Sequence, residues 1–110
     1  MNYVSRFNKE TAVLGHNGTL WASNVFPENV KAPFGAAWGY LEGKSQMEAH
    51  SHPTHEIYTV FSGRGICEVN GTRFEVVPGD VINIPPDAVH TMICEAGESI
   101  LWAAYWWGEV

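Results

Sequence analysis

Turn-forming residues divide the second two thirds of this sequence into short segments, roughly eight to twelve residues apart, and leave little room for helices. The apolar residues between them alternate with polar ones or form short continuous runs, which indicates β-strands. Asn70-Gly71, between two alternating segments, indicates a tight β-hairpin, and Pro78-Gly79-Asp80 and Pro85-Pro86-Asp87 indicate further turns. The sequence therefore predicts an all-β protein.

Eight strands are predicted, and a ninth is expected near the N-terminus. So many short strands in so small a chain favour a barrel or jelly roll, because closing the sheet removes exposed strand edges. The predicted strands are Gly39–Glu42, Gln46–His52, Glu56–Phe61, Gly65–Val69, Thr72–Val76, Val81–Ile84, His90–Cys94 and Ile100–Trp107, with Leu20–Val25 as the ninth.

The composition is that of one folded domain spanning residues 1–110, with 45% hydrophobic and 16% charged residues. The net charge is −6, with only six basic residues, so we expect no nucleic-acid partner. No apolar segment is long enough to span a membrane, and the N-terminal residues do not resemble a secretory signal. Two cysteines are too few for a disulfide scaffold, so we expect free thiols and a cytoplasmic location.

Three histidines and one glutamate in the second half of the chain form a candidate metal site. His50 and His52 are two residues apart, a spacing that puts both rings on one face of a strand. Glu56 and His90 each follow a predicted turn, which allows the chain to bring them back toward the histidine pair. A His-X-His pair alone is more often solvated than ligating, but the two additional ligands reverse that preference.

The spacing of these residues resembles the two motifs of the cupin family, G-X5-HXH-X3,4-E-X6-G and G-X5-PXG-X2-H-X3-N. Motif 1 spans residues 43–63 and motif 2 spans residues 79–94. The matching positions are Gly43, His50, His52, Glu56 and Gly63 in the first motif and Gly79, Pro85 and His90 in the second. The chain departs from the pattern by one extra residue before His50, by Asp87 in place of glycine, and by Cys94 in place of asparagine.

This resemblance implies a small single-domain, RmlC-like jelly-roll cupin with a double-stranded β-helix fold. It also implies that His50, His52, Glu56 and His90 hold one divalent transition metal inside the barrel. Imidazole and carboxylate ligands suit Fe, Mn, Ni, Cu, Co or Zn and do not select among them. Cys94 is expected to pack in the core, with a place beside the metal as the alternative.

Two residues near the proposed ligands are candidates for catalysis. Tyr58 has the same strand parity as Glu56, and it would either donate a hydrogen bond to substrate or simply pack. Glu48 has the parity of His50 and is a candidate acid or base, as is Gln46, whereas Met47 falls on the opposite face.

The resemblance favours a metal-dependent enzyme acting on a small hydroxy, keto or carboxylate substrate, of the dioxygenase or the isomerase or lyase type. The alternatives are a metal-loaded cupin that binds a sugar or metabolite without catalysis and a purely structural metal. Three tryptophans and a tyrosine within Trp102–Trp107 cannot all face inward, so we also expect a homodimer.

Overall fold

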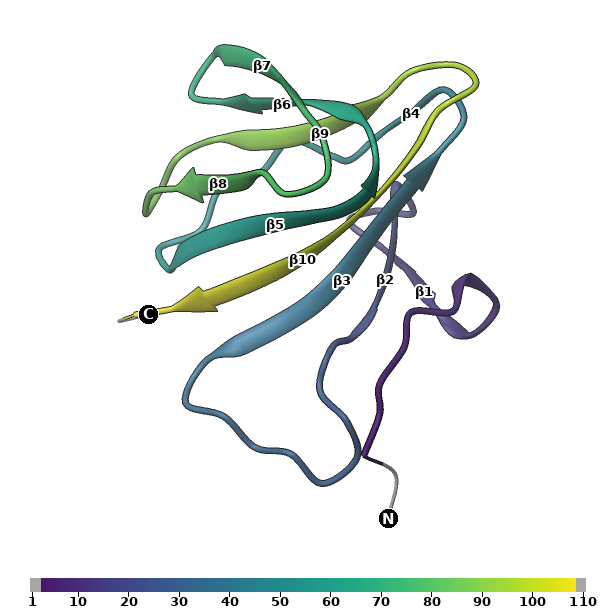
Figure 1. Ribbon diagram of the computed structural model, residues 1–110. Coiled ribbons are helices and arrows are strands. Elements are labelled where there is room, and N and C mark those ends of the chain that lie inside the picture. Colours follow the sequence, from purple (N-terminus) through teal and green to yellow (C-terminus); the bar gives the residue numbers. More distant parts are fainter. Residues whose placement is uncertain (1–2, 109–110) are drawn as a thin grey trace.

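A computed structural model describes residues 3–108 and consists almost entirely of β-strands (Figure 1). A single turn of 3-10 helix, η1, covers Lys9–Thr11. The strands are β1 (Val13–Gly15), β2 (Leu20–Asn24), β3 (Gly35–Glu42), β4 (Ser45–Gln46), β5 (His55–Gly63), β6 (Gly65–Val69), β7 (Thr72–Val76), β8 (Val81–Ile84), β9 (His90–Cys94) and β10 (Ser99–Trp107).

The strands form two sheets that face each other across one hydrophobic core. The larger sheet has the order β1-β2-β3-β10-β5-β8, and the smaller has the order β4-β9-β6-β7. Figure 1 shows the long strands β3, β5 and β10 side by side, with the smaller sheet lying across them. The all-β jelly roll predicted from the sequence is confirmed.

Four predicted strands, β6 to β9, have the predicted bounds, and the hairpin at Asn70-Gly71 joins β6 to β7. Both hairpin residues have positive φ, at 47° and 84°, as the tight turn requires. β3 begins four residues earlier than predicted, because it pairs along its whole length with β10. The three-residue strand β1 was not predicted.

Two motif positions show why their residues suit the local backbone. Gly63 ends β5 with φ 76°, and a Cβ there would overlap the carbonyl oxygen of Ser99. Asp87 stands where the family pattern has glycine, and its φ of 65° is in the same left-handed region. Aspartate enters this region more easily than most residues, which explains how it replaces glycine. The Asp87 amide also donates to the His52 carbonyl, at 2.8 Å, and so connects the two motifs.

The predicted strand Gln46–His52 is wrong beyond its first residue, because β4 ends at Gln46. Gln46 lies opposite Ile93, and the Met47 amide bonds to the Met92 carbonyl, but His50 is the residue opposite His90. The chain therefore has one residue more than β9 over this stretch, which defines a β-bulge at Glu48 and Ala49 opposite Thr91. The Thr91 hydroxyl donates to the Met47 carbonyl inside this bulge.

The bulge changes which side chains face inward. Met47 is almost completely buried, while Gln46 and Glu48 are exposed. Without the bulge, strict alternation would place His50 on the opposite face from Met47. With it, Met47 enters the core and His50 still turns toward His90, so the predicted common face for Gln46, Glu48 and His50 is wrong.

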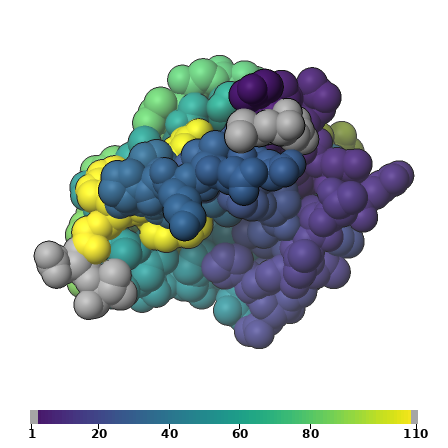
Figure 2. Space-filling model, turned by 90° about the horizontal axis from the view of Figure 1, so that it is seen from below, coloured from purple at the N-terminus to yellow at the C-terminus, as the bar shows by residue number. Residues whose placement is uncertain are grey.

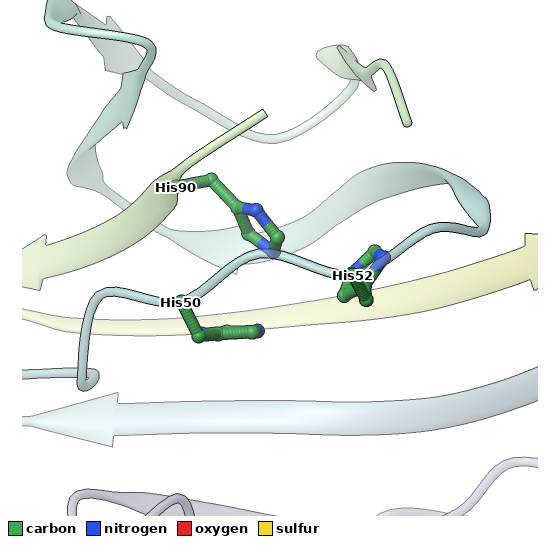
Figure 3. A group of neighbouring side chains, drawn as sticks. All are labelled: His50, His52 and His90. Carbon is green, nitrogen blue, oxygen red and sulfur yellow. The ribbon is translucent and has the colours of Figure 1, made fainter. Parts of the chain in front are cut away.

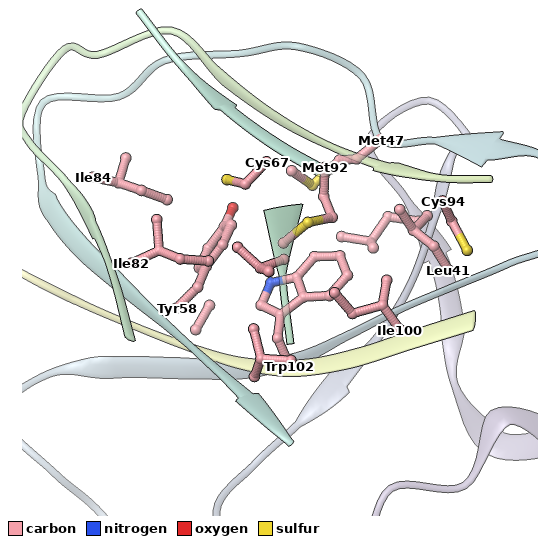
Figure 4. Close-up of a cluster of buried hydrophobic side chains, with 14 of the residues drawn as sticks. Leu41, Met47, Tyr58, Cys67, Ile82, Ile84, Met92, Cys94, Ile100 and Trp102 are labelled. Carbon is pink, nitrogen blue, oxygen red and sulfur yellow. The ribbon is translucent and has the colours of Figure 1, made fainter. Parts of the chain in front are cut away.

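The core lies between the sheets and contains Trp102 at its centre (Figure 4). The Trp102 ring is 1% exposed and lies 5.5 Å, centroid to centroid, from the Tyr58 ring. Other buried members are Leu41, Met47, Val60, Cys67, Ile82, Ile84, Met92, Cys94 and Ile100.

The segment before β3 lies against the C-terminal strand on one face of the molecule, where Figure 2 shows its blue residues beside the yellow ones. Phe34 makes an edge contact with Tyr105, with centroids 6.1 Å apart, and with Phe26 at 5.7 Å. In residues 3–108 no helix is long and apolar enough to cross a membrane.

Candidate metal centre

Three histidines from two separate segments turn their rings toward a common space inside the barrel (Figure 3). His50 and His52 lie on the segment between β4 and β5, and His90 is the first residue of β9. One ring nitrogen from each histidine lies within 4.8 Å of those of the other two. The three residues predicted from the motifs are therefore brought together, at a spacing that one metal ion can bridge.

The orientation of each ring is fixed by its other nitrogen. Nδ1 of His50 lies 2.8 Å from the Glu48 carbonyl, Nδ1 of His90 lies 2.9 Å from the Ala88 carbonyl, and Nδ1 of His52 lies 3.1 Å from the Thr54 carbonyl. Nδ1 of His52 also lies 2.9 Å from the Thr54 hydroxyl, and its Nε2 faces the Glu56 carboxylate. A carbonyl oxygen can only accept, so neutral His50 and His90 rings carry the hydrogen on Nδ1 and the lone pair on Nε2. This is the arrangement of metal-binding histidines, whose second nitrogen is held by a carbonyl or carboxylate.

Glu56 places a buried carboxylate beside two of the three histidines. It is the second residue of β5 and is 6% exposed. Its Oε1 lies 2.9 Å from Nε2 of His52 and 3.4 Å from Nε2 of His90. A buried carboxylate needs a counter-charge or hydrogen-bond donors. A cation between these atoms would satisfy both the carboxylate and the imidazoles.

His90 gives the most direct test of whether the residues fit a metal. Its side chain is fully buried, yet its Nε2 makes no hydrogen bond within the described residues. Buried polar atoms without partners are rare in proteins, and one that points into a cluster of potential ligands indicates a missing partner. The donor set of three Nε2 atoms and one carboxylate oxygen fits a divalent transition metal.

The environment of His50 favours the neutral ring that metal binding requires. Burial lowers the pKa of His50 below its usual value, and the neighbouring His90, His16 and His52 act in the same direction. The hydrogen bond to the Glu48 carbonyl opposes this shift. The neutral ring is thus available as a ligand over a wider pH range than in a free histidine.

A cavity of about 450 Å³ opens next to the cluster, a size typical of small-molecule sites. His50, His52 and Glu56 line one part of it, and Trp102, Ala104 and Trp106 of β10 line another. Additional lining residues from β2, β3 and β5 are Leu20, Ala22, Ala37, Trp38, Gly39 and Tyr58.

Of the two predicted catalytic residues, one lies at the cavity and the other at the protein surface. Tyr58 lines the cavity, with its ring 6.0 Å from that of His90, and burial raises its pKa well above the usual value, so its hydroxyl stays protonated. Glu48 is exposed, accepts a hydrogen bond from Asn17 and does not line the cavity. The catalytic role predicted for Glu48 has no support from this placement, because the bulge turns its side chain outward.

His16 is a site residue that the sequence analysis did not identify. It lies in the loop between β1 and β2, lines the cavity, and its ring centroid is 4.2 Å from that of His50. His16, Asn17 and Gly18 all have positive φ, at 49°, 57° and 76°. Thr19 holds this loop in place by accepting a hydrogen bond from the Glu48 amide, at 2.8 Å. That contact joins residues distant in the sequence, so no local pattern revealed it.

Cys94 lies in the hydrophobic core and not among the cavity-lining residues. Figure 4 shows its side chain beside Leu41, at the far end of the cluster from Ile84. Its nearest polar contact is the Glu95 carbonyl, at 3.8 Å from Sγ. The expected packing role is therefore the one that the structure supports.

A β-barrel with an inward-facing histidine cluster and an adjacent cavity suits the binding of a metal and a small molecule. Comparison with known proteins gives the family: residues 38–107 match the model of the cupin domain, and the chain belongs to the cupin family. These residues include every strand from β4 to β10 and thus all four predicted ligands.

Two solved structures and one curated protein illustrate the similarity. The plu4264 protein from Photorhabdus luminescens is 31% identical, with a TM-score of 0.86, over 99% of this chain and 90% of that one. A Cupin 2 conserved barrel domain protein from Salinispora arenicola is 26% identical, with a TM-score of 0.83, over 96% and 87%. An uncharacterised protein of Methanocaldococcus jannaschii is 45% identical over 47 residues, which cover 42% of this chain and only 38% of that protein.

Proposed function

We propose that this protein is a metal-dependent enzyme in which His50, His52, Glu56 and His90 hold one divalent transition metal. The observation that carries this proposal is the buried Nε2 of His90, which makes no hydrogen bond within the described residues and lies 3.4 Å from the Glu56 carboxylate, next to the other two rings. The substrate is a small molecule whose hydroxy, keto or carboxylate oxygen reaches the metal from the cavity. When bound, such an ion supplies Lewis-acid or redox chemistry of the dioxygenase, isomerase or lyase type.

The residues of the chain have separate tasks in this proposal. The main-chain carbonyls of Glu48, Thr54 and Ala88 keep the three imidazoles in the orientation that exposes Nε2. The Tyr58 hydroxyl, protonated at all ordinary pH values, is a hydrogen-bond donor within the cavity. The apolar side chains of β3 and β10 exclude water from the substrate body, which strengthens the polar interactions at the metal end.

A second candidate function is a metal-loaded module that binds its ligand without turnover. The observation in its favour is the small number of proton-transfer groups in the cavity. Apart from the four proposed ligands, only His16, Thr54 and Tyr58 provide hydroxyl or imidazole groups among the described lining residues. The structural-metal alternative lacks such an observation, because it does not explain the adjoining cavity.

Elemental analysis of the purified protein tests the metal centre, and His55 provides a matched control. His55 directly precedes Glu56 but faces outward, where its ring stacks on Trp107 at 5.0 Å and its Nε2 contacts Asn83 at 2.7 Å. We expect about one metal ion per chain in the wild type and in His55→Ala, and a loss of most of the metal in His90→Ala. Equal metal content in all three proteins would refute the proposed ligand set.

A substrate screen then separates the two candidate functions. Metal-loaded protein is incubated with diketones, thiol acids, hydroxy acids and uronates, while product formation and O2 uptake are measured. Turnover that His90→Ala abolishes supports the enzyme, and saturable binding without turnover supports the binding module. The homodimer and the cytoplasmic location stay predictions at this point.

A further inference from the structure

The cavity wall formed by β3 and β10 has an unusual sequence of paired side chains. Trp102 lies opposite Gly39, Ala104 opposite Ala37, and Trp106 opposite Gly35. A Cβ built on Gly39 would lie 2.5 Å from Cε2 of Trp102, and one on Gly35 would be closer still to Trp106. Each indole therefore lies flat against the backbone of β3, in the space that a side chain would otherwise fill.

These pairs leave a recess between the two tryptophans. The middle pair, Ala37 and Ala104, contributes only methyl groups, whereas an indole covers the wall on either side. Ala104 lies two residues from each tryptophan, about 6.6 Å along the strand, which is enough for a compact ring to enter between them. Ala37, Ala104 and both tryptophans line the cavity. We call this feature the alanine recess.

The alanine recess adjoins the candidate metal centre. β5 pairs with β10 on its other side, so Tyr58 is opposite Ala104 and Glu56 is opposite Trp106. Glu56 thus lies one row along the sheet from the recess, and its carboxylate points to the histidine cluster. A ligand with its oxygen group at the cluster would place the next part of its skeleton over Ala104.

The charges around the cavity restrict the ligand further. Within residues 3–108, no lysine or arginine lines it, and Glu56 is its one lining carboxylate. A second acidic group on the ligand would enter an apolar space without a cationic partner, which is costly. The aromatic and methyl-lined walls favour an uncharged, compact body.

We propose that the ligand of this cupin is an uncharged compound with a compact ring or branched apolar body, seated in the alanine recess, and a single oxygen-bearing head. The contact between the oxygen-bearing head and a metal rests on the proposed function, whereas the fit of the apolar body in the alanine recess is independent of it. This inference selects against sugar acids and dicarboxylates within the broader class of oxygen-bearing substrates.

Three hydroxamates with the same metal-binding head test the proposal. The Co(II)-loaded protein is titrated with acetohydroxamate, benzohydroxamate and 4-carboxybenzohydroxamate, and binding is followed through the visible Co(II) spectrum. We expect benzohydroxamate to bind about 10-fold tighter than acetohydroxamate, because its ring is buried. The added carboxylate should remove most of this gain. Equal affinities for the first two compounds would overturn the proposal.

Filling the recess provides the matched variants. Ala37→Leu and Ala104→Leu should remove the preference for benzohydroxamate and leave the affinity for acetohydroxamate within about 3-fold of wild type. Val81→Leu, on the exposed face of β8, is the control and should bind all three compounds as the wild type does. A preference for the ring that survives in the folded Ala37→Leu variant would overturn the proposal.

The metal-free protein separates failure of the recess from failure of the metal centre. Benzyl alcohol is added to ¹⁵N-labelled protein, and the indole N–H signals of Trp102 and Trp106 are followed by NMR. Shifts of both signals in a protein that takes up no metal would support the recess and refute the metal centre. Unshifted signals in a protein that binds metal would refute the recess alone.

Discussion

Gly39 determines how the central tryptophan of the barrel is seated, so Gly39→Ala is the substitution whose effect follows most directly from the structure. The new Cβ would lie 2.5 Å from Cε2 and 2.6 Å from Cζ2 of Trp102, well inside van der Waals contact. Trp102 is 1% exposed and its ring packs against Tyr58, so it can move only toward the cavity that it lines, at the cost of these core contacts. Either the ring or the β3 backbone must therefore shift.

The change in the free energy of unfolding caused by Gly39→Ala is the difference between a packing cost and an entropic gain. Overpacking of a dense core costs about 1–3 kcal/mol, and replacing glycine by alanine recovers about 0.5–1 kcal/mol through the entropy of the unfolded chain. The net loss of unfolding free energy is therefore about 1–2 kcal/mol, which lowers Tm by about 4–8 °C in a domain of this size. Thermal and urea unfolding, followed by near-UV circular dichroism and tryptophan fluorescence, measures both quantities.

Gly35→Ala is the matched control for this prediction. The overlap with Trp106 is at least as severe, but the Trp106 side chain is only partly buried, whereas Trp102 is in the core, so the Trp106 ring has more room to tilt away. We expect a net change within about 0.5 kcal/mol of zero. The prediction is refuted if Gly39→Ala is as stable as the wild type, or if Gly35→Ala is the more destabilised of the two. Either result would mean that the room available to each indole ring does not determine the loss of stability.

Three further predictions address the site and the assembly. Thr54→Val removes the hydroxyl that lies 2.9 Å from Nδ1 of His52. Calorimetry should then show about 10-fold weaker metal binding with an unchanged fold, and an unaltered affinity would contradict the role of the Thr54 hydroxyl in orienting the His52 ring. Because burial holds the pKa of His50 below its usual value of 6.5, the unfolded chain binds a proton first as the pH falls. The Tm of the metal-free protein should therefore decrease as the pH falls below about 6.5, and it should decrease less in His50→Gln. Equal slopes of Tm against pH in the two proteins would contradict this effect of His50. Phe61 and Val81 are exposed apolar residues of the larger sheet, and light scattering should show a homodimer that Phe61→Asp converts to a monomer; a monomeric wild type would refute this.

The sequence was sufficient to predict the fold class and the positions of most strands. Alternation and turn residues are local signals, and Asn70-Gly71 requires only its own backbone conformation to form a hairpin. The motif spacing also identified residues that lie close together in the structure, because the turns before Glu56 and His90 return the chain to the same end of the barrel.

The errors arise where position depends on distant partners. The bulge at Glu48 and Ala49 is defined by the register against β9, and the sequence indicates it only through the one extra residue before His50 relative to the family pattern. Simple alternation therefore placed Glu48 on the His50 face, where it does not lie. His16 was not identified for the same reason, since contacts with distant residues, from Thr19 to the Glu48 amide and from Asn17 to the Glu48 carboxylate, hold its loop at the cavity.

The bulge between β4 and His50 accommodates the one residue by which the chain exceeds the family spacing before its first histidine. Removal of residue 48 or 49 would restore regular pairing with β9 and leave His50 two residues after Met47, on the same inward face and still opposite His90. Removal of both residues would place His50 directly after Met47 and turn its ring out of the barrel, although every predicted ligand would still be present in the sequence. The barrel therefore tolerates the loss of one residue from this stretch without losing the histidine cluster, but not the loss of two.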